Sequence, residues 1–297
     1  MEQFSLAIPD KAIASGGSAK FLSRGAAVSL LLPLAFLLAI GFIYPLLQLA
    51  KISLFNPEFS LDSYRRLASE PLYLLVLLRT FLVAFCVMAL CLLGGYPVAF
   101  AMSRLKGRYA ALVAACVLIP LWTSVLIRSY AWIVLLQRNG IINSALLDSG
   151  FISEPLKLIY TEGAVVVAMA HVLMPFMILP LFSTLRSIPK DLAHAAFNLG
   201  AGPFVAFVRI TLPLSTPGIF AGCVMTFILA IGFYITPTLV GGPGSMMIAT
   251  LIGQQTTVLL DWSFAAALST VLLVITLALV VVFRKVISLN KGFNGVN

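Results

Sequence analysis

Charge is what this sequence has least of. Only 10% of its 297 residues are charged, whereas 61% are hydrophobic and the mean hydropathy is +1.08. A soluble domain carries roughly a quarter charged residues, so this chain has too few to cover a water-exposed surface. The composition excludes a soluble globular protein and predicts an integral membrane protein built from apolar spans of about 20 residues.

Carboxylates are scarce too, and none of the 10 Asp and Glu residues lies well inside an apolar run. Glu162 and Asp261 come closest, at the predicted outer ends of two runs. Proton- and sodium-coupled carriers usually hold ionisable carboxylates within the membrane, so this absence argues against a secondary carrier. The sequence also lacks a glycine-rich phosphate loop and any catalytic or metal-ligand constellation. We therefore predict no catalytic residue, metal or cofactor on this chain.

The cysteines and the net charge carry no separate function in our interpretation. Each cysteine lies inside an apolar stretch without metal-ligand spacing, so we expect small hydrophobic residues and no disulfide framework at Cys86, Cys91, Cys116 and Cys223. The net charge of +9 comes from short basic clusters between apolar segments. Such clusters are typical of membrane topology signals, and we predict no nucleic-acid binding.

Six apolar runs predict an all-α membrane protein with six transmembrane helices. The first run is longer than the 7–15 residues of a signal-peptide core and has no cleavage site after it, so we expect it to be retained. We assign 1–25 to an N-terminal segment, 26–285 to the transmembrane domain, 186–213 to its main inner loop and 286–297 to a tail. The predicted spans are about 26–50, 72–101, 109–136, 163–185, 214–240 and 263–283.

Basic residues indicate the orientation of these spans. With the N-terminus in the cytoplasm, 12 of the 19 Lys and Arg residues face inward and 5 face outward, while Arg79 and Arg128 lie inside spans. Cytoplasmic loops carry the excess of Lys and Arg in membrane proteins. The sequence therefore predicts that both termini are cytoplasmic.

The inner loop 186–213 contains a predicted amphipathic helix. Ser187 suits an N-cap, Pro189 suits the first turn, and Asp191 complements the helix dipole. Gly200 supplies a helix stop. One apolar face repeats at Leu192, Ala195, Ala196 and Leu199. Its small side chains favour a groove on another protein as its partner, with a helix resting on lipid headgroups as the alternative.

The spacing of residues in this loop carries a family resemblance. His194-Ala195-Ala196 is followed after three residues by Gly200, and after nine more by Ile210-Thr211-Leu212-Pro213. This resembles the Glu-Ala-Ala signature of ABC-importer permeases, the binding-protein-dependent transport inner membrane component family. The resemblance implies a type I ABC importer permease fold, with 186–213 as the coupling loop that docks into a cytoplasmic ATPase subunit. ATP and magnesium would then belong to that partner and not to this chain.

The resemblance assigns ATPase coupling to specific residues. They are Asp191, Leu192, His194, Ala195, Ala196, Leu199, Gly200, Ala201 and Pro213. One position departs from the pattern, because the family has an acidic residue where this chain has His194. An acid–base contact to the ATPase is therefore not carried over; a histidine can hydrogen-bond there or become charged at low pH.

Further segments resemble the spermidine/putrescine branch of the family. They lie at 95–99, 120–124, 128–132, 139–143, 212–214, 217–219, 236–237 and 241–243. The resemblance implies uptake of a polyamine or related amine, with an amino-acid derivative, an opine-like compound or ferric iron as alternatives. It also implies a bacterial inner-membrane location and, as partners, a second permease, two ATPase subunits and a periplasmic solute-binding protein, all surrounded by membrane lipid.

Aromatic and polar residues near the span ends are candidates for the substrate path. An amine can make cation–π contacts with aromatic rings, although Trp and Tyr also form interfacial belts. Arg128 either lines the path or pairs with Asp148, Glu154 or Asp261, and we expect His171 to be a hydrogen-bonded core residue. The candidates are Trp122, Ser124, Arg128, Tyr130, Trp132, Phe233, Tyr234 and Thr236.

Overall fold

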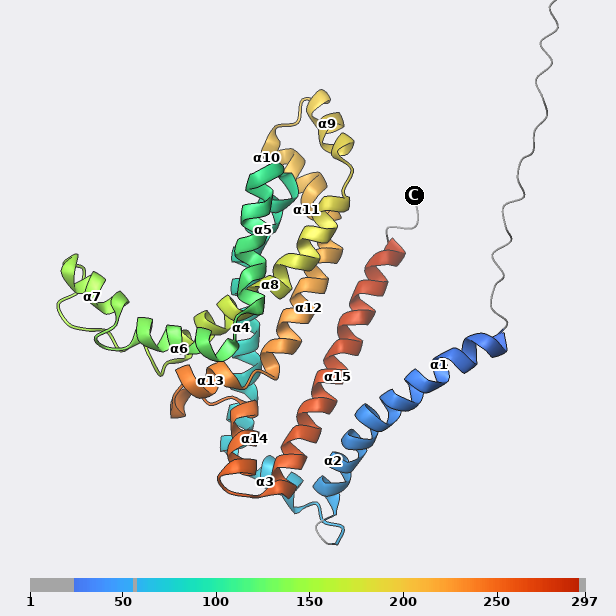
Figure 1. The fold of residues 1–297 in the computed structure, drawn as a ribbon, viewed down its shortest axis with the longest axis vertical. Coiled ribbons are helices and arrows are strands. Elements are labelled where there is room, and N and C mark those ends of the chain that lie inside the picture. The colour runs from blue at the N-terminus through green and yellow to red at the C-terminus, as the bar shows by residue number, and fades with distance from the viewer. Residues whose placement is uncertain (1–23, 56–57, 294–297) are drawn as a thin grey trace, which may run out of the picture. The chain divides into compact units, whose positions relative to one another are not determined.

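The computed structural model describes residues 24–55 and 58–293, and within these ranges every regular element is a helix (Figure 1). The prediction of an all-α protein is confirmed. The predicted segment 1–25 lies outside the described residues up to residue 23, as do the last four residues of the predicted tail 286–297.

The helices differ widely in length and include two π-helical turns, η1 and η2, and one 3-10 turn, η3. In chain order they are α1 (Arg24–Leu38), η1 (Ala39–Ile43), α2 (Tyr44–Leu54), α3 (Asp62–Ser69), α4 (Pro71–Arg104), α5 (Gly107–Trp122), α6 (Val125–Leu136), α7 (Ile141–Asp148), α8 (Glu162–Ser187), α9 (Lys190–Asn198), α10 (Pro203–Ala206), η2 (Phe207–Thr211), α11 (Leu212–Leu214), α12 (Thr216–Ile231), α13 (Ile235–Val240), η3 (Pro243–Ser245), α14 (Ile248–Thr257) and α15 (Trp262–Phe293).

The chain forms two compact units, of which the first ends at Gln48. Its described part is α1, η1 and the start of α2, and the stretch Ser29–Leu54 is long and apolar enough to cross a membrane. The π turn η1 lies just before Pro45. Because proline has no N–H for the carbonyl four residues earlier, the helix widens there instead of keeping its regular bonds.

The second unit, from Leu49 onward, is built around α4, α8 and α12, which pack on one another. Its main buried cluster includes Val87 and Cys91 on α4 and Leu173 on α8. Two glycines of α12 bring it close to α8. A Cβ on Gly222 would lie 2.7 Å from the Met177 sulfur, and one on Gly218 would lie 2.6 Å from the Thr184 hydroxyl oxygen. Such small-residue contacts are a common way for membrane helices to pack.

A second cluster closes the end of this unit that lies away from α9 in Figure 1. Tyr73 of α4 packs on Phe264 of α15, with ring centroids 4.8 Å apart. Thr80 is fully buried, and its hydroxyl oxygen accepts a 2.8 Å hydrogen bond from the backbone N–H of Ile248 at the start of α14. Charged side chains are paired nearby, since Arg79 bonds Glu162 at 2.7 Å.

Four helices are long and apolar enough to span a membrane, and the number rises to six if each of two bent pairs counts as one span. One pair, α5 with α6–α7, bends by 102° at Thr123 and Ser124. The other, α10–α11 with α12, bends by 59° at Ser215. The predicted run 109–136 is thus two helices in the structure, and 214–240 is interrupted after Ile231.

Candidate functional site

The predicted amphipathic helix of the inner loop is α9. It starts at Lys190, and Pro189 stands in the N-cap position without a side-chain capping bond. The prediction that Ser187 caps this helix is wrong, because Ser187 is the last residue of α8 and its hydroxyl donates to the Thr184 carbonyl at 2.8 Å. Proline cannot continue a preceding helix readily, so α8 ends before Pro189 and α9 begins after it.

The end of α9 explains why a glycine stands at position 200. Gly200 has φ +84, the left-handed region that disfavours side chains. Its N–H donates to the Phe197 carbonyl at 3.0 Å, and the Ala201 N–H donates to the Ala196 carbonyl at 3.0 Å. These two bonds form a Schellman motif, in which the two alanines occupy the positions that commonly make its apolar contact. The predicted helix stop is confirmed.

The apolar face of α9 is open. Leu192 is 42% exposed and Leu199 is 88% exposed. Ala195 and Asp191 are exposed as well, while Ala196 is half-buried. The two leucines of this face are therefore not covered by other parts of the described chain.

His194 lies on the same helix and is exposed. Its ring contacts Phe197 edge-on, with centroids 6.3 Å apart. No hydrogen bond of the His194 side chain occurs among the described residues. The imidazole is therefore available to a partner.

The loop is attached to the transmembrane helices through Phe207. Its ring lies 5.9 Å from the Tyr96 ring and 5.5 Å from the Phe100 ring, both on α4, in edge-on geometry. The Tyr96 hydroxyl also lies 3.0 Å from the Ser215 hydroxyl, which is fully buried. Pro213 lies between these contacts, in α11. Sequence reasoning missed Phe207 and Ser215; their only signal is an aromatic and a small polar residue flanking the Ile-x-Leu-Pro segment.

Half of the substrate-path candidates gather at the bend between α5 and α6. Trp122 ends α5 and is 87% exposed, and Tyr130 of α6 is 53% exposed. The hydroxyl of Ser124 caps α6 by accepting from the Leu126 N–H at 3.3 Å. Arg128 bonds back across the bend, from Nη2 to the Thr123 carbonyl at 3.4 Å. The bend therefore presents aromatic rings outward and an arginine at its corner.

Arg128 has none of the three acidic partners that we considered. Asp261 pairs with Arg66 instead, at 3.3 Å, and no ion pair within residues 24–55 and 58–293 includes Arg128. Its Nε and Nη1 atoms are shielded and have no hydrogen-bond acceptor in the described part of the chain.

Three further candidates, Phe233, Tyr234 and Thr236, lie on or just before α13, which packs on α6 (Figure 1). Thr236 is fully buried, and its hydroxyl lies 2.9 Å from that of Ser129. It therefore joins the two helices. Tyr234 packs closely on α14, where a Cβ on Gly253 would lie 2.5 Å from its ring. Phe233 is half-buried against the main core.

Trp132 makes a polar contact across α6 and α8. Its indole N–H donates to Nδ1 of His171 at 3.2 Å, and the two rings meet edge-on. The expected hydrogen bond of His171 is confirmed, although the residue is exposed and not in a core. No group of three His, Cys, Asp or Glu side chains that could hold a metal occurs among the described residues.

Residues 95–287 match the family model described as "Binding-protein-dependent transport system inner membrane component". The chain is 37% identical over 234 residues to the "Spermidine/putrescine transport system permease protein PotB" of Escherichia coli (strain K12), covering 78% of this chain and 85% of that protein. The protein of the same name from Haemophilus influenzae (strain ATCC 51907 / DSM 11121 / KW20 / Rd) is 36% identical over 226 residues, covering 76% and 79%.

A solved structure is also similar in fold. It is described as "Crystal structure of bacterial alginate ABC transporter in complex with alginate pentasaccharide-bound periplasmic protein". One of its chains superposes with a TM-score of 0.69 at 19% identity, covering 86% of this chain and 92% of that one. At this identity the similarity concerns the fold alone.

Proposed function

This chain belongs to the family of binding-protein-dependent transport system inner membrane components, and from that premise we propose that it drives uptake of a polyamine together with a separate ATPase. It is a permease subunit of the inner membrane. The finer proposal is that a second, related permease completes the translocation path, that two ATPase subunits bind below it, and that a periplasmic solute-binding protein delivers the substrate. ATP and magnesium act on the ATPase, and this chain makes and breaks no bonds.

The observation that carries the proposal is the open apolar face of α9 on a rigid helix end. Leu192 and Leu199 are exposed, while Gly200 fixes the exit of the chain. A short helix of this kind can fill a groove on a partner by its apolar face. The contacts of Phe207 with α4 then pass a displacement of α9 to the transmembrane helices.

For the topology we propose six spans with both termini in the cytoplasm. Each bent pair then counts as one span, which brings the four long helices to six. The excess of basic residues in the inner loops supports this orientation. The coupling loop 186–213 faces the cytoplasm, within a transmembrane domain of residues 26–285.

For the substrate we propose a polyamine such as spermidine or putrescine. The relatives named for this transport support it, and the exposed rings of Trp122 and Tyr130 offer cation–π contacts to an amine. Arg128 would repel an amine, and its bond to Thr123 instead suits a residue that holds the bend. Tyr234 remains a candidate for the path, whereas Thr236 has a packing role.

The proposed transport cycle has three steps. ATP-driven closure of the ATPase pulls α9 and its counterpart on the second permease together and opens the cavity outward. The binding protein releases the amine into it, and hydrolysis returns the cavity to the inward-facing state. A ligand moves such an equilibrium only as far as its affinities for the two states differ.

The test is purification from native membranes through a C-terminal tag, followed by ATPase measurements with candidate solute-binding proteins. We expect an ATPase subunit and a second permease to co-purify. Ala196→Asp should release the ATPase, because a charge would enter the apolar interface. Thr257→Asp, the matched control, places the same charge at an exposed position of α14 and should retain the ATPase. Binding protein loaded with spermidine should raise ATP turnover.

The opposite result identifies the rival function. If the chain purifies alone, if Ala196→Asp changes nothing, and if the reconstituted chain moves solute down a gradient without an ATPase, it is a secondary carrier. If the complex assembles but only another solute raises ATP turnover, the polyamine assignment is wrong while the importer assignment remains.

A further inference from the structure

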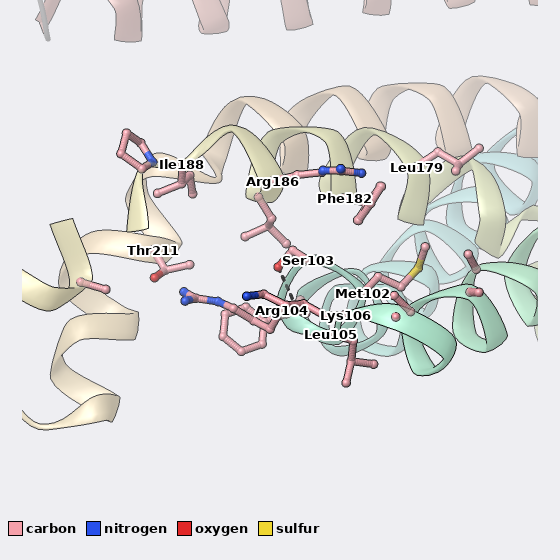
Figure 2. Close-up of a pocket in the computed structure, with 18 of the residues that line it drawn as sticks. Met102, Ser103, Arg104, Leu105, Lys106, Leu179, Phe182, Arg186, Ile188 and Thr211 are labelled. Atoms are coloured by element: carbon pink, nitrogen blue, oxygen red, sulfur yellow. Dashed lines mark hydrogen bonds between the residues drawn. The ribbon is translucent and has the colours of Figure 1, made fainter. Parts of the chain in front are cut away.

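A cavity of about 710 Å³ lies beside the coupling loop (Figure 2). It is bounded by the turn between α4 and α5, by the last turns of α8 and by η2. Three cationic side chains from two places in the chain line it, Arg104 and Lys106 at the turn and Arg186 on α8. None of the substrate-path candidates lies in it.

The two arginines are held by aromatic rings and not by carboxylates. Arg104 lies over the Phe100 ring at 5.2 Å, and Arg186 lies over the Phe182 ring at 5.8 Å. No ion pair in the described ranges includes Arg104, Lys106 or Arg186. Stacking on a ring positions a guanidinium but leaves its charge uncompensated. The described lining of the cavity therefore carries three cationic side chains and no acidic residue.

The start of α5 adds to this positive field. Lys106 is the N-cap residue of α5 and makes no side-chain capping bond, and Gly107 lines the cavity. N-cap positions usually hold an oxygen that accepts from the first N–H groups. A lysine cannot accept, so an external anion is the group that suits this helix start.

The opposite part of the cavity is apolar and extends along two helices. On α5 the lining runs from Gly107 to Leu118, a rise of about 16 Å, and on α8 it runs from Arg186 back to Leu179, about 10 Å. A free phosphate or an acidic protein loop has no long apolar surface to bury against this lining. A molecule with an anionic head and a hydrocarbon chain matches both parts.

We propose that this cavity binds the phosphate group of an anionic lipid of the cytoplasmic leaflet through Arg104, Lys106 and Arg186, with an acyl chain along the wall between α5 and α8. The proposal rests on the orientation given under the proposed function. Basic pockets between membrane helices on the cytoplasmic side are suited to such headgroups. Because the cavity borders Ala193 of α9 and Thr211 of η2, a bound lipid also steadies the base of the coupling loop.

Basic residues at the ends of α4 and α8 also complement the helix dipoles, and a cytoplasmic ATPase could instead meet them with acidic residues. The helix-dipole role would leave the cavity unexplained, and the ATPase contact would leave its apolar wall unexplained. The experiment separates these possibilities.

The test uses the full chain with whatever subunits co-purify, stripped of lipid and titrated separately with phosphatidylglycerol, phosphatidylethanolamine and inorganic phosphate. Bound lipid is counted by native mass spectrometry. The variant Arg104→Gln/Arg186→Gln removes two cations from the cavity. Its control, Arg108→Gln/Arg209→Gln, removes two exposed cations of neighbouring segments that do not line it.

We expect phosphatidylglycerol to bind about 25-fold more weakly to the first variant than to the control, since each cation near an anionic lipid contributes roughly a factor of five. Arg104→Lys/Arg186→Lys should bind nearly as the parent does, which separates lost charge from lost folding. Leu118→Trp should obstruct the apolar wall and weaken lipid binding, whereas Leu112→Trp, exposed on α5 outside the cavity, should not.

Three results overturn the proposal. If Arg104→Gln/Arg186→Gln and its control bind lipid equally, the cavity does not recognise the lipid headgroup. Equal competition by inorganic phosphate, with Leu118→Trp unchanged, makes it a phosphate site. Loss of a co-purified ATPase with lipid binding unchanged makes it a protein contact. Lipid counting needs no ATPase, so a chain that purifies alone but binds phosphatidylglycerol refutes the transport assembly and not this site.

Discussion

Serine in place of Gly200 isolates the backbone requirement of the coupling loop. A Cβ at Gly200 meets nothing within 4 Å, so the substitution costs only the left-handed backbone, at φ +84. That conformation disfavours a residue with a side chain by about 1–2 kcal/mol. Gly202 has equally open space but φ −72, in the N-cap position of α10, where serine is favoured. The pair therefore differs in backbone conformation alone.

Gly200→Ser should therefore make the C-terminal end of α9 open more often. A loss of about 1–2 kcal/mol raises the open fraction roughly 5- to 30-fold. Amide hydrogen exchange at Gly200 and Ala201, whose N–H groups make the two terminal bonds, should accelerate by that factor in Gly200→Ser and not in Gly202→Ser. Gly200→Asn should lie between the parent and serine, because asparagine tolerates this conformation better.

The same series measures coupling. Retention of the ATPase subunit should fall in the order Gly200, Asn, Ser, while Gly202→Ser behaves as the parent. Equal exchange rates in the two serine variants would refute the conformational argument. Faster exchange with undiminished ATPase binding would refute the claim that a rigid helix end is needed for docking.

Substitutions at two further positions test how the helices of the second unit pack. Gly222→Ala should lower the unfolding temperature in detergent, because its Cβ would lie 2.7 Å from the Met177 sulfur and 3.0 Å from the Met177 carbonyl, and overpacking of about 1–3 kcal/mol exceeds the gain of about 1 kcal/mol in helix propensity. Gly94→Ala meets only a flexible methionine methyl at 3.2 Å and should be neutral or stabilising, so the reverse order contradicts the close-approach argument. Thr80→Val should cost about 1–3 kcal/mol by leaving the Ile248 N–H unbonded, and Thr80→Ser should restore most of it. Equal unfolding temperatures of the valine and serine variants would rule out that bond as a stabilising contact.

The features that sequence predicted well depend on local chemistry. A long apolar run is stable in lipid, where its backbone N–H and C=O groups must bond to one another, and a single segment can do this only as a helix. The helical class therefore follows from composition. The helix stop at Gly200 follows from a single residue that alone tolerates positive φ. The open face of α9 follows from its period of apolar residues, because nothing in the loop could cover it.

The features that sequence did not predict depend on which of several possible structures a segment takes, or on which partner a side chain meets in the fold. Ser187 has the chemistry of an N-cap, but α8 keeps it as its last residue. The sequence also gives no sign that the Thr236 hydroxyl lies 2.9 Å from that of Ser129, on another helix. The 102° bend leaves no mark on hydropathy, since Trp122 and Val125 both belong to one apolar run. At the bend the Ser124 hydroxyl caps α6, but serine is common elsewhere in membrane helices, so its presence does not predict a bend.

The arrangement of contacts also indicates where the chain can flex during transport. Phe207 is fixed between two rings of α4, and α12 meets α8 at Gly222 without a side chain to compress. A displacement of α9 therefore cannot be absorbed near the loop, because close-packed interiors transmit strain, and we expect it to move α4, α8 and α12 as one body. The bend at Thr123 and Ser124, where the helical bonds are already interrupted, is where that movement can become a rotation. Such a rotation would change the surroundings of the exposed rings of Trp122 and Tyr130, the residues proposed to contact the amine.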